Sequence, residues 1–172
     1  ESGLVKGLID ATTTEVCDLL MGGVFSAGED RLGSIIRTEL PYVGSCGALD
    51  MVNFGARETV PEKYKERQFH VHNANVTLMR TSVEENKHIG EWLADKLNQM
   101  QGEVRFLVPL KGVSSLDSEE HAFHNPEADA ALFDALEKKV IQTDKRKLIK
   151  LNRNINDPEF STELVKQFKA II

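Results

Sequence analysis

Short apolar runs alternate with longer amphipathic segments along most of the chain. The short runs have strand length, and in the longer segments apolar residues recur every three or four positions, as in helices that bury one face. The expected strands cover residues 4–10, 41–44, 68–73, 103–109 and 147–151. Because strands that alternate with helices imply parallel crossovers, the pattern predicts an α/β fold. We expect a Rossmann-like open, mostly parallel sheet of about five strands with helices on both faces, in a single domain over residues 1–172.

Capping residues mark the expected helix starts. Thr12 with Glu15, and Ser82 with Glu85, have the spacing of a capping box, in which each side chain bonds the backbone N–H of the other residue. Two adjacent glycines at positions 22 and 23 mark the end of the first helix. The expected helices cover residues 12–21, 30–39, 82–100, 125–140 and 157–171, with a helical turn at 60–64. Residues 75–81 are expected to form a connector.

The stretch from Tyr42 to Arg57 departs from both patterns. After a short strand, small residues and glycines are followed by polar side chains. Glycines let a backbone approach a ligand closely, and polar groups then fix its orientation. A long loop is uncommon in a compact domain unless it binds something or is disordered, and the apolar residues here argue against disorder. We interpret this stretch as the centre of a binding site. Its candidate ligand contacts are Ser45, Cys46, Gly47, Asp50 and Asn53.

The segments that follow the expected strands are rich in hydroxyls, amides, glycines and cations, whereas those that precede the strands carry little organised chemistry. Ligands of open α/β sheets bind beyond the carboxyl ends of the strands, near the switch in strand order. The three threonines after the first strand suit an anion at a helix N-terminus, although helix capping alone also explains them. The further candidates are Thr12, Thr13, Thr14, Asn73, Arg80, Lys111, Gly112 and Ser114.

Two of these candidates are cations. Lys111, beside Gly112 and close to Ser114, resembles a phosphate cradle in residue type. The segment lacks the Gly-x-x-x-x-Gly-Lys-Ser/Thr spacing of a Walker A loop, so the signal is weak. Arg80 precedes a helix and suits a phosphate or a carboxylate, but a surface ion pair is an equal alternative.

Histidine and cysteine offer two other chemistries. His70 and His72 share one face of an expected strand, a spacing that can chelate a metal, and His121 and His124 are further donors. A packed or hydrogen-bonded role is the commoner one for such residues, and we predict no metal. Cys46, at a strand end beside a glycine, suits a nucleophile with His70 or His72 as base, although small buried cysteines are common.

The composition of the chain disfavours several classes of protein function. A hydrophobic fraction of 41% with 28% charged residues is ordinary for a soluble globular protein. A net charge of −6 disfavours nucleic acids and anionic membranes as partners. No apolar run has the length of a membrane span, and two cysteines make no disulfide framework, so we expect a cytoplasmic protein. The chain begins with Glu1 rather than methionine, and we expect it to be the second lobe of a longer protein.

Several motifs resemble the Tm-one-like ATP-binding domain family, best known for a plant protein that confers resistance to tobamoviruses. The resemblance covers nearly the whole chain, and its longest motif is specific. The motifs are Asp10-Ala-Thr-Thr-Thr-Glu15, Gly47-Ala-Leu-Asp-Met-Val-Asn-Phe-Gly55, Glu58-Thr-Val-Pro61, Val76-Thr-Leu-Met-Arg-Thr81, Asn125-Pro-Glu-Ala-Asp-Ala-Ala-Leu-Phe133 and Ile155-Asn-Asp-Pro158.

The resemblance implies a two-lobed α/β unit in which an N-terminal lobe completes the site. It also implies ATP, with Mg²⁺, as the ligand, but no reaction and no catalytic residue. We therefore expect a lobe that binds ATP or a related phosphorylated metabolite at the carboxyl ends of the strands. One alternative is an enzyme for a small carbonyl or phosphate-bearing metabolite, with Asp50, Cys46 or a histidine transferring protons. The other is a protein-interaction module, and we expect a homo-oligomer.

Overall fold

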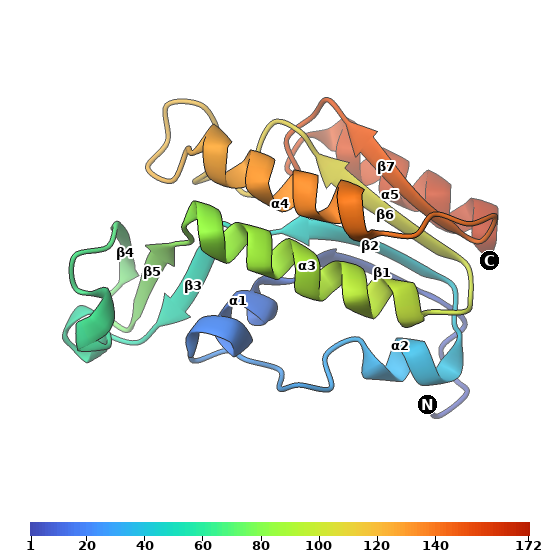
Figure 1. The fold of residues 1–172 in the computed structure, drawn as a ribbon, viewed down its shortest axis with the longest axis horizontal. Helices are drawn as coiled ribbons and strands as arrows, with labels where there is room; N and C mark the ends of the chain where they lie inside the picture. The colour runs from blue at the N-terminus through green and yellow to red at the C-terminus, as the bar shows by residue number, and fades with distance from the viewer.

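A four-stranded parallel sheet forms the centre of the computed structural model, which describes residues 1–172 (Figure 1). The order of its strands is β1-β2-β6-β7. Neighbours on both sides and helices on both faces cover β2, so every residue of this strand is buried. This explains its run of apolar and small residues. The strands are β1 (Leu8–Thr12), β2 (Tyr42–Gly47), β6 (Val104–Pro109) and β7 (Arg146–Leu151).

Helices cover both faces of this sheet, but unequally (Figure 1). The strand order advances in one direction, and right-handed crossovers then place the connecting helices on one face. The helices of that face are α1 (Thr14–Met21), α2 (Gly33–Thr38), α3 (Val83–Gln99) and α4 (Pro126–Lys139). Only α5 (Pro158–Ile171), which follows the last strand, packs on the opposite face.

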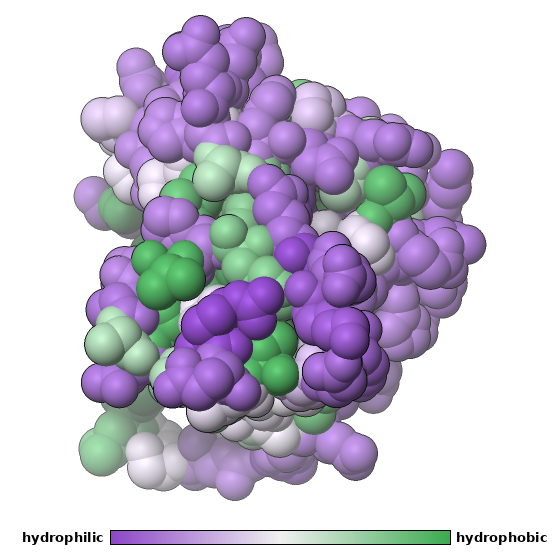
Figure 2. Space-filling model, turned by 90° about the vertical axis from the view of Figure 1, so that its left-hand side faces the viewer, coloured by the Kyte–Doolittle hydropathy of each residue, from purple (hydrophilic) through white to green (hydrophobic).

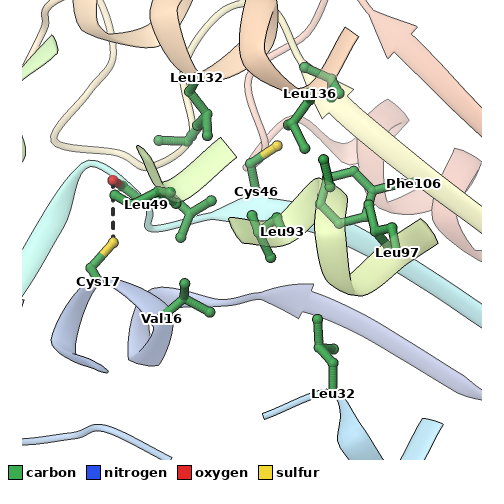
Figure 3. Packing of buried hydrophobic residues seen from close by; sticks show 14 of the residues in the cluster. Val16, Cys17, Leu32, Cys46, Leu49, Leu93, Leu97, Phe106, Leu132 and Leu136 are labelled. Carbon is green, nitrogen blue, oxygen red and sulfur yellow. Dashed lines mark hydrogen bonds between the residues drawn. The ribbon is translucent and has the colours of Figure 1, made fainter. Parts of the chain in front are cut away.

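The core divides accordingly into two clusters of buried apolar residues. The larger holds 24 residues: it fills the space between the sheet and helices α1 to α4 and extends beyond it to residues 52, 54, 64, 79 and 113. Figure 3 shows Cys46 of this cluster among the leucines of α3 and α4. The smaller consists of Val43 and Leu107 from the sheet with Phe160 and Leu164 from α5. Residues 42 and 43 therefore point to opposite faces, as the period of two along a strand requires.

A second, antiparallel sheet of three strands extends beyond the carboxyl end of β2 (Figure 1). Its strand order is β3-β5-β4, and β4 and β5 form a hairpin. Two short 3-10 turns, Arg57–Thr59 and Glu62–Tyr64, connect β3 to β4. The strands are β3 (Met51–Phe54), β4 (Phe69–Asn73) and β5 (Val76–Arg80).

The predicted α/β class, with an open sheet and helices on both faces, is confirmed. The main sheet has four strands, because the strand expected at 68–73 is β4 of the antiparallel sheet. The capping box at α3 is also confirmed: the backbone N–H of Glu85 donates to Ser82 Oγ, and the Ser82 N–H donates to the Glu85 carboxylate. Asn125 caps α4 as expected, and Gly22 ends α1 in the left-handed conformation.

The central stretch is the main correction. It is not a loop, because β2 continues through Gly47 and β3 follows after a turn at residues 48–50. Residues 75–81 are likewise not a connector, because β5 lies there between β3 and β4. Short strands with polar residues are stabilised by pairing with their neighbours, which local sequence does not reveal.

The beginning of α1 also differs from the prediction. The N-cap is Thr13, and the capping box of Thr12 and Glu15 is not formed. The Thr13 hydroxyl donates to the carbonyl of Ser45 instead, 3.2 Å away, and so ties α1 to β2. The first strand begins at Leu8 rather than at residue 4, because pairing with β2 begins only there.

Gly90 lies where α3 meets α4, and it gives a test of this packing. A Cβ atom at this position would lie 2.7 Å from the carbonyl oxygen of Leu132 and 2.8 Å from Ala135 Cβ. Gly90→Ala should therefore lower the free energy of unfolding by about 1–3 kcal/mol, although alanine in a helix usually gains about 1 kcal/mol over glycine. Urea denaturation measures the change. His88→Ala, at an exposed position of the same helix, should stay within about 0.5 kcal/mol of the parent. A Gly90→Ala protein as stable as the parent would contradict this packing.

Candidate functional site

The loops that follow all four parallel strands meet at the carboxyl edge of the sheet. They enclose a crevice of about 360 Å³, which we call the carboxyl-edge crevice. Convergence of this kind is what an open α/β sheet provides for a ligand. The crevice is lined by Ala11, Thr12, Ala48, Met51, Val113, Ser114, Ser115, Ile155 and Asn156.

The end of β2 gives the crevice its shape. Gly47 lies so close to β1 that an added Cβ would be 2.3 Å from the carbonyl oxygen of Ala11, so only glycine fits there. Ala48 has a φ of +58°, a left-handed conformation that costs a residue with a side chain about 1–2 kcal/mol. Its N–H donates to the carbonyl of Val113 over 2.8 Å, which fixes the turn against the loop after β6. The turn then places Asp50 in the interior.

Two of the three threonines at residues 12–14 form side-chain hydrogen bonds within the chain. Besides the bond from Thr13 to β2, the Thr14 hydroxyl lies 3.4 Å from the carbonyl of Met51 and accepts from Asn53 Nδ2 at 3.1 Å. Thr12 is exposed in the crevice, and its hydroxyl forms no hydrogen bond within the chain. No side chain caps the first turn of α1, and although the N–H groups of Thr13 and Val16 bond backbone carbonyls, those of residues 14 and 15 have no partner within the chain.

Asp50 is fully buried and bonded to the crevice lining. The Ser114 hydroxyl donates to Asp50 Oδ2 over 2.7 Å, while Asp50 Oδ1 has no hydrogen-bond partner. Burial raises the pKa of Asp50 to about 6; the Ser114 bond opposes this shift, and the nearby charge of Asp117 adds to it. Asp50 thus holds or releases a proton near neutral pH, directly behind a side chain of the crevice.

Arg80 is buried, and its guanidinium is occupied by partners within the chain. Nη2 lies 3.0 Å from Asp117 Oδ1 and 2.8 Å from Asp129 Oδ1. Nε donates to the carbonyl of Phe123, and Nη1 donates to the Thr81 hydroxyl. The surface ion pair considered for Arg80 is therefore wrong. No guanidinium nitrogen is left for a ligand, and the side chain ties β5 to the loop after β6 and to α4.

A second and larger cavity of about 770 Å³, the α4 cleft, lies between α4 and the loops after β6 and β7. It contains the candidates Lys111 and Gly112, and Gly112 adopts a φ of +115° that favours glycine. Sequence reasoning did not select Asp117 or Asp129. Asp129 lies in the first turn of α4, where the helix dipole already explains an acid, and Asp117 is one of several acids in a polar loop. The cleft is lined by Leu110, Lys111, Gly112, Asp117, Ser118, Glu119, His124, Pro126, Asp129, Ala130, Phe133, Asn154 and Asp157.

Nine of the thirteen candidates line neither cavity, and the three not yet described are Ser45, Asn73 and Cys46. Ser45 donates from Oγ to the carbonyl of Leu107 inside the sheet. Asn73 lies in the β4–β5 hairpin, where its side chain accepts from the backbone N–H of Asn75. Cys46 is fully buried, and burial raises the pKa of its thiol, so the structure contradicts its role as a nucleophile.

The histidine pair of β4 lies in the antiparallel sheet rather than at the carboxyl edge. His70 packs edge-on against Phe123, with ring centroids 6.3 Å apart, and His72 is exposed. No group of three or more His, Cys, Asp or Glu side chains is arranged to hold a metal ion. No helix is both long enough and apolar enough to cross a lipid bilayer.

Comparison with known proteins gives consistent matches. Residues 1–172 match the model of the uncharacterised protein family (UPF0261) C-terminal domain. A UPF0261 protein of Rhizobium meliloti is 57% identical over 171 residues, which cover 99% of this chain and 43% of that protein. For a UPF0261 protein of Clostridium tetani, the identity is 48% over 166 residues, covering 96% of this chain and 41% of that protein.

A tomato protein is also similar. The ToMV resistance protein Tm-1(GCR237) of Solanum lycopersicum is 41% identical over 169 residues, which cover 98% of this chain and 22% of the tomato protein. The predicted resemblance to the Tm-one-like family is thereby confirmed. The chain spans less than half the length of each of these relatives.

The raised pKa of Asp50 predicts a pH dependence of stability. The folded state binds this proton more tightly than the unfolded state, so the contribution of Asp50 is fully present below about pH 4 and is lost as pH rises through 6. At about 1.4 kcal/mol per pKa unit, the loss is about 3 kcal/mol. Asp50→Asn cannot ionise, so its stability relative to the parent should rise by about that amount between pH 4 and pH 8, as measured by urea denaturation. Asp95→Asn, at an exposed position, is the control. A constant difference across this range would contradict the assignment.

Proposed function

The chain belongs to uncharacterised protein family UPF0261, as its C-terminal domain, and on this premise we propose that it is a lobe that binds ATP or a related phosphorylated metabolite. The carboxyl-edge crevice is the proposed site of the phosphate groups. An N-terminal lobe of the same protein is proposed to complete the site.

The observation that carries this proposal is the composition of the crevice. All four parallel strands contribute to it through the segments at their carboxyl ends, and none of its lining residues is acidic. The hydroxyls of Thr12 and Ser115 form no hydrogen bond within the chain and are exposed there. Free donors with no carboxylate among the lining residues suit an anion. The positive end of the α1 dipole lies beside Thr12 and adds to the attraction.

The size of the crevice supports a divided site. A volume of about 360 Å³ is at the lower end for ligand pockets, which suits phosphate groups better than a whole nucleotide. The chain spans 43% of the Rhizobium meliloti relative, so a second lobe has ample length to supply contacts to a base and ribose. Mg²⁺ would be held mainly by phosphate oxygens and water, because the crevice offers it no carboxylate.

Thermal unfolding of the full-length protein with ATP and Mg²⁺ tests the proposal. At a hundred times the dissociation constant, a ligand stabilises the folded state by about 2.7 kcal/mol, which raises the melting temperature by several degrees. Ser115→Glu places a negative charge in the crevice and should abolish the shift. Ser34→Glu, at an exposed position of α2, should leave the shift unchanged. No shift at millimolar nucleotide, or an equal shift in both variants, would contradict the proposal.

Self-association is a second candidate, favoured by the free edge of β4. This strand pairs only with β5, and its residues Phe69–Asn73 include no lysine, proline or acid of the kind that protects edge strands. Val71 of this strand is 57% exposed. Figure 2 shows apolar residues between polar ones on the face of the molecule that carries this sheet. The occupant we propose is β4 of a second copy, related by a two-fold axis.

Light scattering of the full-length protein after size exclusion tests this candidate. The parent should elute as a dimer, and Val71→Lys should convert it to a monomer because a lysine on an edge strand opposes pairing. Val165→Lys, on the exposed face of α5, should remain a dimer. A monomeric parent, or a dimeric Val71→Lys protein, would exclude association through β4.

A further inference from the structure

The α4 cleft carries ionisable groups that the proposed binding of a phosphorylated ligand in the crevice does not involve. Its volume of about 770 Å³ is ample for a small metabolite. Its walls carry two buried carboxyl groups, an imidazole and an ammonium group, whereas the carboxyl-edge crevice has no charged lining.

The two buried carboxyl groups share one guanidinium nitrogen. Asp117 Oδ1 and Asp129 Oδ1 both accept from Arg80 Nη2, at 3.0 and 2.8 Å. Asp117 Oδ2 is also fixed, because the backbone N–H of Val113 donates to it over 2.9 Å. Asp129 Oδ2 accepts no hydrogen bond from the chain, although more than nine-tenths of Asp129 is buried and the residue lines the cleft. Of the two, Asp129 is therefore the carboxyl group with an oxygen to which no N–H group of the chain donates.

Asp129 holds its proton more strongly than an ordinary aspartate. Burial, and next the negative charge of Asp117, raise the pKa of Asp129, and a hydrogen bond between the two carboxyl groups adds to this; the charge and the hydrogen bond of Arg80 offset the rise only in part. Two carboxylates this close cannot both ionise freely. Asp129 is thus suited to donate a proton to a ligand, and Arg80 then stabilises the carboxylate that remains.

His124 supplies a base in the same cleft. Its Nδ1 lies 3.2 Å from the backbone carbonyl oxygen of Asp117. A carbonyl oxygen only accepts hydrogen bonds, so Nδ1 carries a hydrogen, and Nε2 is the ring nitrogen that can accept a proton in the neutral imidazole. The residue is exposed and lines the cleft, so Nε2 is available as a proton acceptor.

The remaining lining residues define the ligand. The Lys111 ammonium group forms no ion pair within the chain and suits one anionic substituent. Glu119 and Asp157 also line the cleft and disfavour a multiply charged anion such as a nucleotide. Leu110 and Phe133 add an apolar wall for a short carbon chain. This combination fits a small carbonyl compound with at most one negative charge.

We propose that the α4 cleft is an acid–base catalytic site that enolises a small carbonyl metabolite, with His124 as base and Asp129 as acid. His124 Nε2 takes a proton from the carbon beside the carbonyl group. The electron pair of that C–H bond forms the C=C bond of the enol, and the carbonyl oxygen takes the proton of Asp129. The products are the enol, an imidazolium and a carboxylate, and the reverse step returns both protons. Arg80 is a positioning residue, and no oxidant or reductant is needed.

Hydrogen exchange into D₂O tests this step without knowledge of the natural substrate. Full-length protein is incubated in D₂O with pyruvate, 2-oxobutyrate or dihydroxyacetone, and proton NMR follows the loss of the C–H signal beside the carbonyl group. At least one of the three should exchange well above the buffer rate. His124→Gln and Asp129→Asn should each lower that rate at least 100-fold, since acid–base catalysis typically contributes about 10²–10⁴-fold.

A matched histidine control distinguishes catalysis at this cleft from exchange at the protein surface. His121→Gln, at an exposed position of the same loop that does not line the cleft, should leave the rate unchanged. His124 is exposed, so its variant should keep the parent circular dichroism even if Asp129→Asn does not fold. Buffer-rate exchange with all three compounds would overturn the proposal. Equal rates for the His124→Gln and His121→Gln proteins would also overturn it. ATP binding is measured separately, so this proposal and the nucleotide proposal fail independently.

Discussion

The buried guanidinium of Arg80 joins three parts of the chain that are far apart in sequence. It leaves the end of β5, bonds the loop after β6 at Phe123, and pairs with Asp117 of that loop and Asp129 of α4. Removing charges from water costs several kcal/mol per ion, and pairing offsets this only when the geometry is good, so such a cluster contributes more to position than to net stability. Position is what the region requires, because the loop fixed by Arg80 lines both the crevice and the cleft.

The two cavities have different chemistry although they share the loops that build them. The crevice presents neutral donors beside a helix N-terminus, which suits a highly charged anion. The cleft presents carboxyl groups, an imidazole and an ammonium group, which suit proton transfer on a compound of low charge. One side chain fixes the boundary between them. The Asn154 amide nitrogen donates to the carbonyls of Lys111 and Ser114 and lies 3.2 Å from the Ser118 hydroxyl. These contacts hold residues of the crevice lining and of the cleft lining in fixed relative positions.

The sequence predicted what depends on local pattern and missed what depends on distant partners. The long helix from Ser82 and the parallel strands could be predicted, because periodicity, helix caps and strand-length apolar runs are local features of the sequence. The antiparallel sheet could not be predicted, because β3 and β5 are stabilised by pairing with each other. The same limit applies to the site. The segments at the carboxyl edge were identified by composition, but the burial of Arg80 between Asp117 and Asp129 comes from the fold alone.

The unequal covering of the sheet has a consequence for native-state fluctuations. Helix α5 is held by a small cluster that includes Phe160 and Leu164, whereas the opposite layer shares 24 buried residues. Elements with few buried contacts open at lower free energy than the rest of a domain. The loop that leads into α5 supplies Asn154 to the cleft and Ile155 to the crevice. Both cavities therefore persist only as long as α5 stays packed on the sheet. The rate of amide hydrogen exchange in α5 measures how often they open.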